Sequence, residues 1–167
     1  MYRLTNAIRS AVFSHANGMV DIAGKPTTER IASASCSVLA PQRIVDAIFS
    51  DTLKVNSKGD ILSTARIAGT LAAKRTSELI PFCHQIPLSQ VSIEITRDGP
   101  GNIKVRAQAK TIHQTGVEME ALTAVSLSAL TIYDMTKSAL KCTTDSIVIT
   151  EIQLDYKTGG SSKNIPS

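Results

Sequence analysis

The chain has 167 residues, 43% of them hydrophobic, which is enough for one globular domain with a buried core. Its 18 Lys and Arg outnumber its 14 Asp and Glu, and the net charge of +4 favours an anionic ligand over a membrane surface. No apolar run approaches the ~20 residues that a bilayer-spanning helix needs. The three cysteines form no C-x-x-C pair, so the sequence indicates neither a disulfide framework nor a zinc site, and a reducing compartment fits best.

Residues 1–17 are predicted to form an N-terminal arm outside the domain. The segment up to residue 15 contains Arg3, Arg9 and Ser10 but no acidic residue, which is also the composition of a short mitochondrial presequence. We therefore expect a cytoplasmic protein, with the mitochondrial matrix as the alternative if residues 1–15 are a presequence.

A strand followed by two helices is predicted for the first half of the chain. Between residues 32 and 38, apolar side chains alternate with serines in the two-residue period of a half-buried strand. A short amphipathic helix is expected after Pro41. Asp60 is suited to cap a second helix over residues 61–80, which Pro81 would end. The small residues of this helix leave room for another backbone to approach closely: Ala65, Ala68, Gly69, Ala72 and Ala73.

The second half is predicted to contain a hairpin, one long helix and a last strand. Residues 91–96 and 103–111 alternate apolar and polar side chains on either side of the turn sequence RDGPGN. The helix, over residues 115–141, is charged only near its ends, and Thr115 with Glu118 forms the pattern of a capping box at its start. Residues 146–154 are predicted to form a strand. Its apolar side chains change from one face to the other between Ile149 and Ile152, which indicates a bulge.

The order of predicted elements is therefore β, α, α, β, β, α, β. With one helix treated as an insertion, this predicts an α+β fold of the ferredoxin-like split βαβ type, with an antiparallel four-stranded sheet and helices packed on one face. We divide the chain into the arm (1–17), a central domain (18–156) and a Gly/Ser-rich tail (157–167). The tail carries Lys157 and Lys163, and its backbone N–H groups could hold an anion, with disorder as the alternative.

One polar face interrupts the apolar helix near its end. Asp134, Lys137 and Lys141 lie at i, i+3 and i+7, so they line up over about two turns. An ordinary exposed ion pair explains this pattern on composition alone. However, an Asp near a helix C-terminus faces the negative end of the macrodipole, so helix stability does not favour it there. A Lys beside a carboxylate is also suited to proton transfer if its pKa is brought near neutrality.

Two further groups of polar residues lie near predicted element ends: Lys58 with Asp60, and Lys74 with Arg75 and His84. Taken singly, each has an ordinary structural explanation, as a loop lysine, a helix cap or a structural histidine. The sequence has no Ser-His-Asp order, HExxH zinc motif or Gly-rich dinucleotide fingerprint. Taken together, the residues indicate a basic site for a phosphorylated ligand, with lysine acid–base chemistry as the candidate reaction type.

A series of motifs identifies a known family. In chain order they are KGD (58–60), ARIAG (65–69), AAKRT (72–76), LIP-CH (79–84), TGVEMEALTA (115–124), LTIYDM (130–135) with Lys137, and KTGG (157–160). GMVDI and KPTTER extend the match toward the N-terminus, so that it covers roughly residues 18 to 163. In these motifs the chain resembles the MoaC family of molybdenum cofactor (molybdopterin) biosynthesis.

The resemblance implies a lyase with cyclic pyranopterin monophosphate synthase activity. Such an enzyme converts (8S)-3′,8-cyclo-7,8-dihydroguanosine 5′-triphosphate to cyclic pyranopterin monophosphate and pyrophosphate. The resemblance also implies a homohexamer, built as a trimer of dimers, with each site at a dimer interface. We expect no metal or tightly bound cofactor, although Mg²⁺ can accompany the triphosphate or the pyrophosphate.

The resemblance also assigns roles by position. The catalytic residues would be Asp134, Lys137, Lys58, Lys74 and His84. The substrate would be bound by Phe82, Cys83, His84, Met119, Glu120, Arg75, Lys157 and Lys163. Several cations are needed around a triphosphate, and forming a cyclic phosphate requires protons to move while the pyrophosphate leaves.

Several positions depart from the family pattern: Gln85, His113, Gln114, Thr136, Ser161 and the opening Leu4-Thr5-Asn6. None removes a proposed catalytic residue, but they leave a family member of low activity as an alternative. A basic ferredoxin-like sheet is also the frame of RNA-binding modules that stack bases on sheet aromatics. Aromatic residues make up only 4% of this chain and neither hairpin strand carries one, so RNA binding is the weaker hypothesis.

Overall fold

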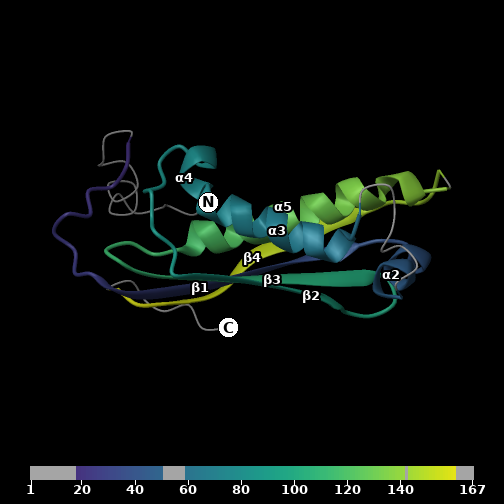
Figure 1. Cartoon of the computed structure of the whole chain (residues 1–167), viewed down its shortest axis with the longest axis horizontal. Coiled ribbons are helices and arrows are strands. Elements are labelled where there is room, and N and C mark those ends of the chain that lie inside the picture. The colour runs from purple at the N-terminus through teal and green to yellow at the C-terminus, as the bar shows by residue number, and fades with distance from the viewer. Residues whose placement is uncertain (1–17, 51–58, 142, 161–167) are drawn as a thin grey trace, which may run out of the picture.

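The chain folds into a four-stranded sheet with helices on one face (Figure 1). A computed structural model describes residues 18–50, 59–141 and 143–160. In chain order, the elements are β1 (Thr28–Leu39), α2 (Gln42–Phe49), α3 (Ile61–Lys74), α4 (Thr76–Leu79), β2 (Gln90–Arg97), β3 (Asn102–His113), α5 (Glu118–Thr136), the 3-10 turn η1 (Lys137–Ala139) and β4 (Val148–Thr158). This is the predicted order of elements, with α4 and η1 added.

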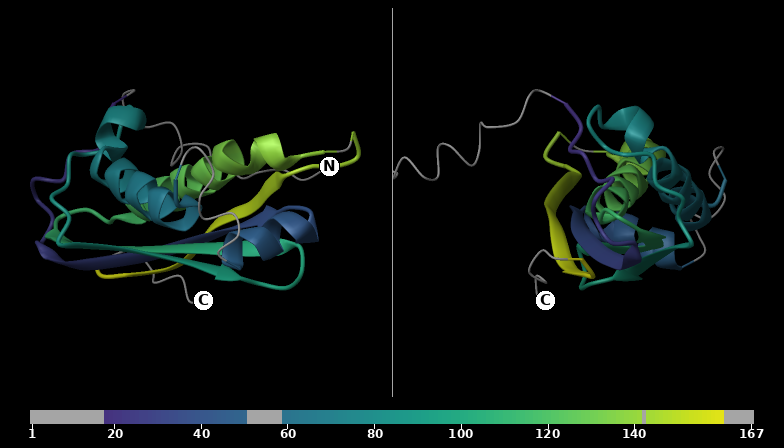
Figure 2. Two further views of the ribbon diagram at one scale, coloured as in Figure 1. Left: turned by 45° about the vertical axis from the view of Figure 1, so that its right-hand side comes forward. Right: turned by 90° about the vertical axis from the view of Figure 1, so that its left-hand side faces the viewer.

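The sheet has the strand order β2-β3-β1-β4, and every neighbouring pair is antiparallel. β1 and β3 are therefore the central strands, while β2 and β4 form the edges. The long helices α3 and α5 lie side by side over one face (Figure 2), and the short α2 packs beside β3. This arrangement confirms the predicted α+β fold of the ferredoxin-like type, with one extra helix.

The core lies between the sheet and α5. Alternate side chains of β1 point toward the helices and are completely buried: Ala32, Ala34, Cys36 and Val38. Small and branched side chains of α5 join the same core: Ala121, Ala124, Val125, Ala129 and Ile132. The thiol of Cys36 donates a hydrogen bond to the carbonyl of Val125, 3.7 Å away. Burial raises the pKa of this thiol to about 11, so Cys36 is a core residue and not a nucleophile near neutral pH.

The face of the sheet away from the helices is polar along its central strands. In the middle of the two strands, the side chains on this face are Ser33, Ser35, Ser37, Lys104, Arg106 and Gln108. The three serines are each less than a tenth exposed, because longer neighbouring side chains cover them. An RNA-recognition module would stack bases on aromatic side chains of such strands. Neither β1 nor β3 contains a Phe, Tyr or Trp.

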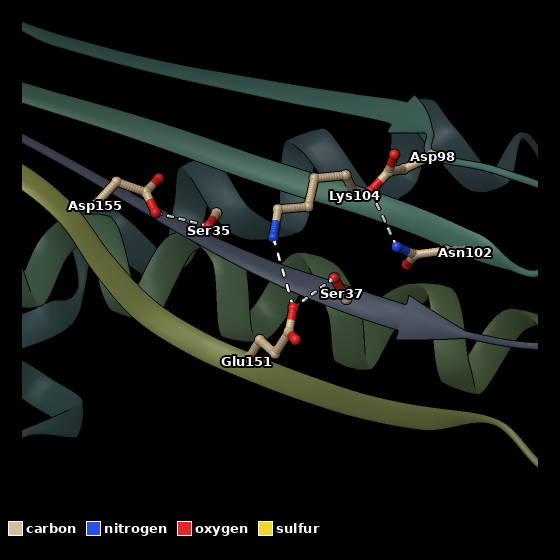
Figure 3. A network of polar contacts seen from close by, with 7 residues as sticks. All are labelled: Ser35, Ser37, Asp98, Asn102, Lys104, Glu151 and Asp155. Carbon is tan, nitrogen blue, oxygen red and sulfur yellow. Dashed lines mark hydrogen bonds and ion pairs between the residues drawn. The ribbon is translucent and has the colours of Figure 1, made fainter. Parts of the chain in front are cut away.

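Irregular pairing at two points distinguishes the edge strand β4. Its register against β1 shifts twice, and Asp155 and Glu151 lie at these two points. Asp155 accepts a hydrogen bond from the hydroxyl of Ser35 at 2.8 Å, and Glu151 accepts one from Ser37 at 3.3 Å (Figure 3). Glu151 has a φ of 54°, a left-handed conformation that costs a residue other than glycine about 1 kcal/mol or more. The predicted bulge in this strand is thus confirmed.

Helices α3 and α5 approach each other closely because small residues line their contact. The hydroxyl of Ser128 donates a hydrogen bond to the carbonyl of Ala65 at 3.0 Å. A Cβ added at Gly69 would overlap the same hydroxyl and lie 2.7 Å from the carbonyl oxygen of Ala124. Ala65 near the start of α3 contacts Ser128, whereas Gly69, one turn later, also contacts Ala124, one turn earlier in α5. The two helices are therefore antiparallel. The prediction that small residues admit another backbone is confirmed.

The helix predicted over residues 61–80 is in fact two helices. α3 ends at Lys74, where the backbone N–H of Arg75 bonds to two carbonyls of the preceding turn and tightens it. The separate turn α4 follows immediately. Asp60 caps α3 as predicted, because its carboxylate accepts backbone N–H bonds from two residues of the first turn at 2.9 and 3.2 Å.

The central helix, predicted over residues 115–141, is shorter at both ends. α5 begins at Glu118, its N-cap is Val117 instead of Thr115, and no side-chain capping bond forms, so the prediction of a capping box with Thr115 was wrong. The carboxylate of Glu118 instead accepts a hydrogen bond from Lys157 at 2.8 Å. At the other end, the hydroxyl of Thr136 bonds to the carbonyl one turn earlier at 2.6 Å, and α5 gives way to η1.

Replacing Gly69 with alanine should destabilise the fold, because the added Cβ would overlap atoms of α5 in a packed contact. We expect the free energy of unfolding to fall by about 1–3 kcal/mol, measured by urea denaturation followed by circular dichroism. Gly24→Ala is the matched control, since a Cβ there meets no atom within 4 Å. Equal stability of the two variants would contradict the tight contact between α3 and α5.

Candidate active site

A cavity of about 390 Å³ lies where the segment after α4 meets the start of α5. The predicted site residues that line it are Phe82, Cys83, His84, Met119 and Glu120. Phe82 is 62% exposed and Met119 is 37% exposed, so both present apolar surface to a ligand. Val20, Ile22 and Ile86 add further apolar surface to the wall. The structure thus brings together two predicted segments that are distant in the sequence.

Glu120 is a buried acid in the wall of this cavity, with only 3% of its surface exposed. Burial raises its pKa to about 7; a backbone hydrogen bond opposes the rise, and the nearby charge of Glu118 adds to it. Burial also raises the pKa of the Cys83 thiol, with a further contribution from Glu120. Near neutral pH the Glu120 carboxyl is therefore present in both forms, so it can donate a hydrogen bond as well as accept one.

A second cavity, of about 140 Å³, lies beside the start of β1 and the end of β4. The cations that line it are Lys25, Arg30 and Lys157. Arg30 is 8% exposed, and its guanidinium donates hydrogen bonds to the carbonyls of His113 and Gln114, both at 3.2 Å. Gly160 follows β4 with a φ of 79°, and a Cβ there would overlap the same guanidinium. A cavity with this charge is suited to a phosphate group.

The two cavities share part of their wall. Thr115, Gly116 and Glu118 line both, together with Lys25. Glu118 also pairs with Lys157, with 2.8 Å between Oε1 and Nζ and side-chain exposures of 27% and 23%. The site therefore has a larger apolar part with a buried carboxyl and a smaller cationic part, joined at the start of α5. This combination is suited to a ligand with a flat ring and phosphate groups.

The predicted catalytic pair lies at the other end of α5. The Nζ atom of Lys137 is 2.7 Å from Oδ1 of Asp134, and each side chain is about half exposed. Its hydrogen bond to Asp134 raises the pKa of Lys137, so the amine is held as an ammonium ion. Fourteen residues of helix separate Asp134 from Glu120, which corresponds to about 21 Å. Within one chain, the pair does not meet the cavities at the start of α5.

The remaining predicted site residues lie outside both cavities or outside the described chain. Lys74 and Arg75 stand at the end of α3, which antiparallel packing places beside the start of α5, and both are exposed. Lys58 and Lys163 lie outside the described residues. Within the described ranges, no three His, Cys, Asp or Glu side chains gather as a metal site requires. None of the helices in those ranges has the length and apolar character to cross a membrane.

Comparison with known proteins gives one family for this chain. The sequence model of the MoaC family matches residues 19–160. The chain belongs to the MoaC family. A relative from Bordetella avium, a cyclic pyranopterin monophosphate synthase, is 48% identical over 146 residues, which cover 86% of this chain and 85% of the relative. A relative of the same name from a Nocardioides species is 46% identical, covering 89% of this chain and 88% of its own length.

The MoaC match contains all the described candidate residues, whereas Lys163 lies beyond it. Two cations of the smaller cavity, Lys25 and Arg30, were missed as site residues by the sequence analysis. Arg30 lies in the same helix-facing phase of β1 as Ala32. An arginine at a position where the pattern calls for an apolar residue is the sequence signal that could have revealed this site residue. Its partners could not be found from local sequence, because only the pairing of β1 with β3 and β4 brings them near.

Replacing Glu120 with glutamine should remove a pH dependence of stability. In the folded wild type the carboxyl has a pKa of about 7, above its ordinary 4.5. At pH values between these two, the folded state therefore keeps a proton that the unfolded state has lost. The free energy of unfolding should therefore fall as pH rises from about 5 to about 8, by no more than roughly 3 kcal/mol. Glu120→Gln should match the wild type near pH 5 and exceed it near pH 8.

Urea denaturation at fixed protein concentration would measure this difference at both pH values. Glu94→Gln, which removes an exposed carboxylate on β2, is the matched control and should keep the wild-type dependence. The same pH slope in Glu120→Gln and in the wild type would contradict the buried, proton-binding state of Glu120.

Proposed function

We propose that the chain is a cyclic pyranopterin monophosphate synthase, a lyase that converts 3′,8-cyclo-7,8-dihydroguanosine 5′-triphosphate to cyclic pyranopterin monophosphate in molybdenum cofactor biosynthesis. The observation that carries this proposal is the pair of adjoining cavities at the start of α5, one apolar with a buried carboxyl and the other cationic. Membership of the MoaC family and relatives that bear this enzyme's name support it. Pyrophosphate would be the second product.

The two parts of the substrate match the two cavities. The fused ring would lie in the larger cavity, where Phe82 and Met119 offer apolar surface and the carboxyl of Glu120 can bond to a ring N–H or carbonyl. The triphosphate would extend into the smaller cavity toward Arg30 and Lys157. Because a triphosphate carries several negative charges, a cluster of cations is needed to hold it and to stabilise the leaving pyrophosphate.

Asp134 and Lys137 would reach this site from a second copy of the chain. In a two-fold dimer with antiparallel α5 helices, the end of one α5 lies beside the start of the other, and two equal sites are completed. The outer surface of the helices offers exposed apolar side chains for such a contact: Ile67, Leu71, Leu130 and Tyr133. The family resemblance extends this dimer to a homohexamer, a trimer of dimers.

The Asp134–Lys137 pair would supply the proton transfers. Asp134 holds Lys137 as an ammonium ion, so Lys137 would enter the reaction as an acid and regain its proton when the attacking hydroxyl is deprotonated. Enclosure by the second copy would remove water from the amine and lower its pKa toward neutrality. Lys74 and Arg75 would add positive charge near the phosphates, and His84, which lines the larger cavity, would lie beside the ring. Lys58 lies outside the described residues and stays a predicted catalytic residue on the family resemblance alone.

Incubation of the purified protein with the cyclised triphosphate, followed by detection of pyrophosphate and product, tests the activity. Lys137→Arg keeps the charge but cannot readily release a proton near neutral pH. We expect this variant to bind substrate normally and to be almost as slow as Lys137→Ala in single-turnover product formation. An arginine variant within about tenfold of the wild-type rate, roughly 1.4 kcal/mol of barrier, would refute the proton-transfer role.

Mixing two inactive variants tests whether the site needs two chains. His84→Ala damages the cavity at the start of α5, and Asp134→Asn damages the pair at its end, so each protein alone should be inactive. If each site combines the start of one α5 with the end of another, random co-assembly leaves roughly a quarter of the sites intact. Co-expressed or co-refolded variants should then recover about that share of wild-type activity. A mixture as inactive as its parents would contradict the two-chain site.

A further inference from the structure

The ion pair between Glu118 and Lys157 stands at the junction of the two cavities, where a phosphorylated ligand would have to pass. Glu118 is the one acidic side chain among the described residues that line the smaller cavity. The other charged groups there are cations. The carboxylate of Glu118 therefore binds one of the charges that a phosphate group would use.

Helix formation alone does not explain where this carboxylate lies. An acid in the first turn is favoured by the helix macrodipole, but the hydrogen bond that the Glu118 carboxylate accepts comes from Lys157 in β4. Its side chain folds back against Gly116, where an added Cβ would overlap the carboxylate, and it reaches Lys157 in β4, 39 residues away. Lys157, rather than the end of the helix, is the polar partner of the carboxylate.

We propose that Glu118 is a resident counter-anion for Lys157. It holds the lysine in place while the cavity is empty, and a phosphate group displaces its carboxylate when a ligand binds. The proposal rests on the proposed function for the identity of that ligand, the triphosphate end of the substrate and the pyrophosphate product. Glu118 is thus a positioning residue that acts through Lys157, and no covalent bond forms or breaks in the exchange.

This exchange has two physical effects. Lys157 is ordered before the ligand arrives, so its side-chain freedom is not lost again on binding. At the same time, the carboxylate competes with phosphate for the ammonium group, so pyrophosphate is bound less tightly than by the cations alone. Weaker product binding favours release of pyrophosphate after the reaction.

Titration calorimetry of the full-length protein with inorganic pyrophosphate tests the exchange. Glu118→Gln should tighten binding of pyrophosphate roughly fivefold, because Lys157 is no longer held by a competing carboxylate. Lys157→Met should weaken it. In the double variant, the gain from Glu118→Gln should disappear, since no ammonium group remains to be released. Glu94→Gln, which removes an exposed negative charge on β2, is the matched control and should leave the Kd unchanged.

A simple repulsion between Glu118 and pyrophosphate predicts a different pattern. Repulsion through space would let Glu118→Gln tighten binding equally with and without Lys157, and that result would overturn the proposal. Unchanged or weaker binding by Glu118→Gln would overturn it as well. Glu118→Asp keeps the charge and the preference for a helix start but shortens the side chain, so it should tighten binding by less than Glu118→Gln. If Glu118→Asp does not tighten binding at all, simple repulsion is favoured. The same conclusion follows if Glu118→Gln tightens binding equally in the wild type and in Lys157→Met.

A parallel assay of lyase activity separates this inference from the proposed function. If the gain from Glu118→Gln depends on Lys157 but the protein does not convert the cyclised triphosphate, the proposed function is rejected and the counter-anion role of Glu118 is retained. Conversion without such coupling would retain the function and reject the counter-anion.

Discussion

Where the chemistry can take place depends on the close antiparallel contact between α3 and α5. Small side chains bring the two backbones together, and the hydroxyl of Ser128 bonds directly to a carbonyl of α3. Because the helices run in opposite directions, the end of α3 and the segment after α4 come to the start of α5. Asp60 and the first turn of α3 come to its other end. The 19-residue helix α5 therefore carries one part of a polar site at each end.

The two ends of α5 differ in their exposure to water, and this difference decides how their ionisable groups behave. At the start, Glu120 is buried and its pKa is raised, while Arg30 is fixed by backbone carbonyls. At the end, Asp134 and Lys137 are half exposed, and the carboxylate is the main cause of the raised pKa of the lysine. Burial of this pair in an assembly would add a desolvation cost that opposes the charge of Lys137. Association of chains would then change the proton affinity of Lys137.

Sequence reasoning succeeded where local rules decide the structure. The cap at Asp60, the alternation in β1 and the small residues of α3 each depend on a few neighbours, and each was predicted correctly. It failed where a distant partner decides. Glu118 fits a capping box by spacing, but Lys157 offers it a stronger, charged partner.

Arg30 was missed as a site residue for a related reason, because its carbonyl partners come near only through strand pairing. The family motifs did locate residues at both ends of α5. The helix predicted over residues 115–141 already implies about 21 Å between Glu120 and Asp134 in one chain, and α5 confirms that both lie on the same helix. Local sequence does not show whether a second copy of the chain brings the two ends of α5 together, because that depends on contacts between chains.

The two irregular points of β4 also limit what can pair with that edge of the sheet. An edge strand offers a row of unpaired N–H and C=O groups, to which a strand of another molecule can add. In β4 this row is interrupted at Asp155 and Glu151, and the left-handed backbone of Glu151 turns the strand out of line with an incoming partner. We therefore expect these irregular points to hinder edge-to-edge pairing of β4 with another copy of the chain.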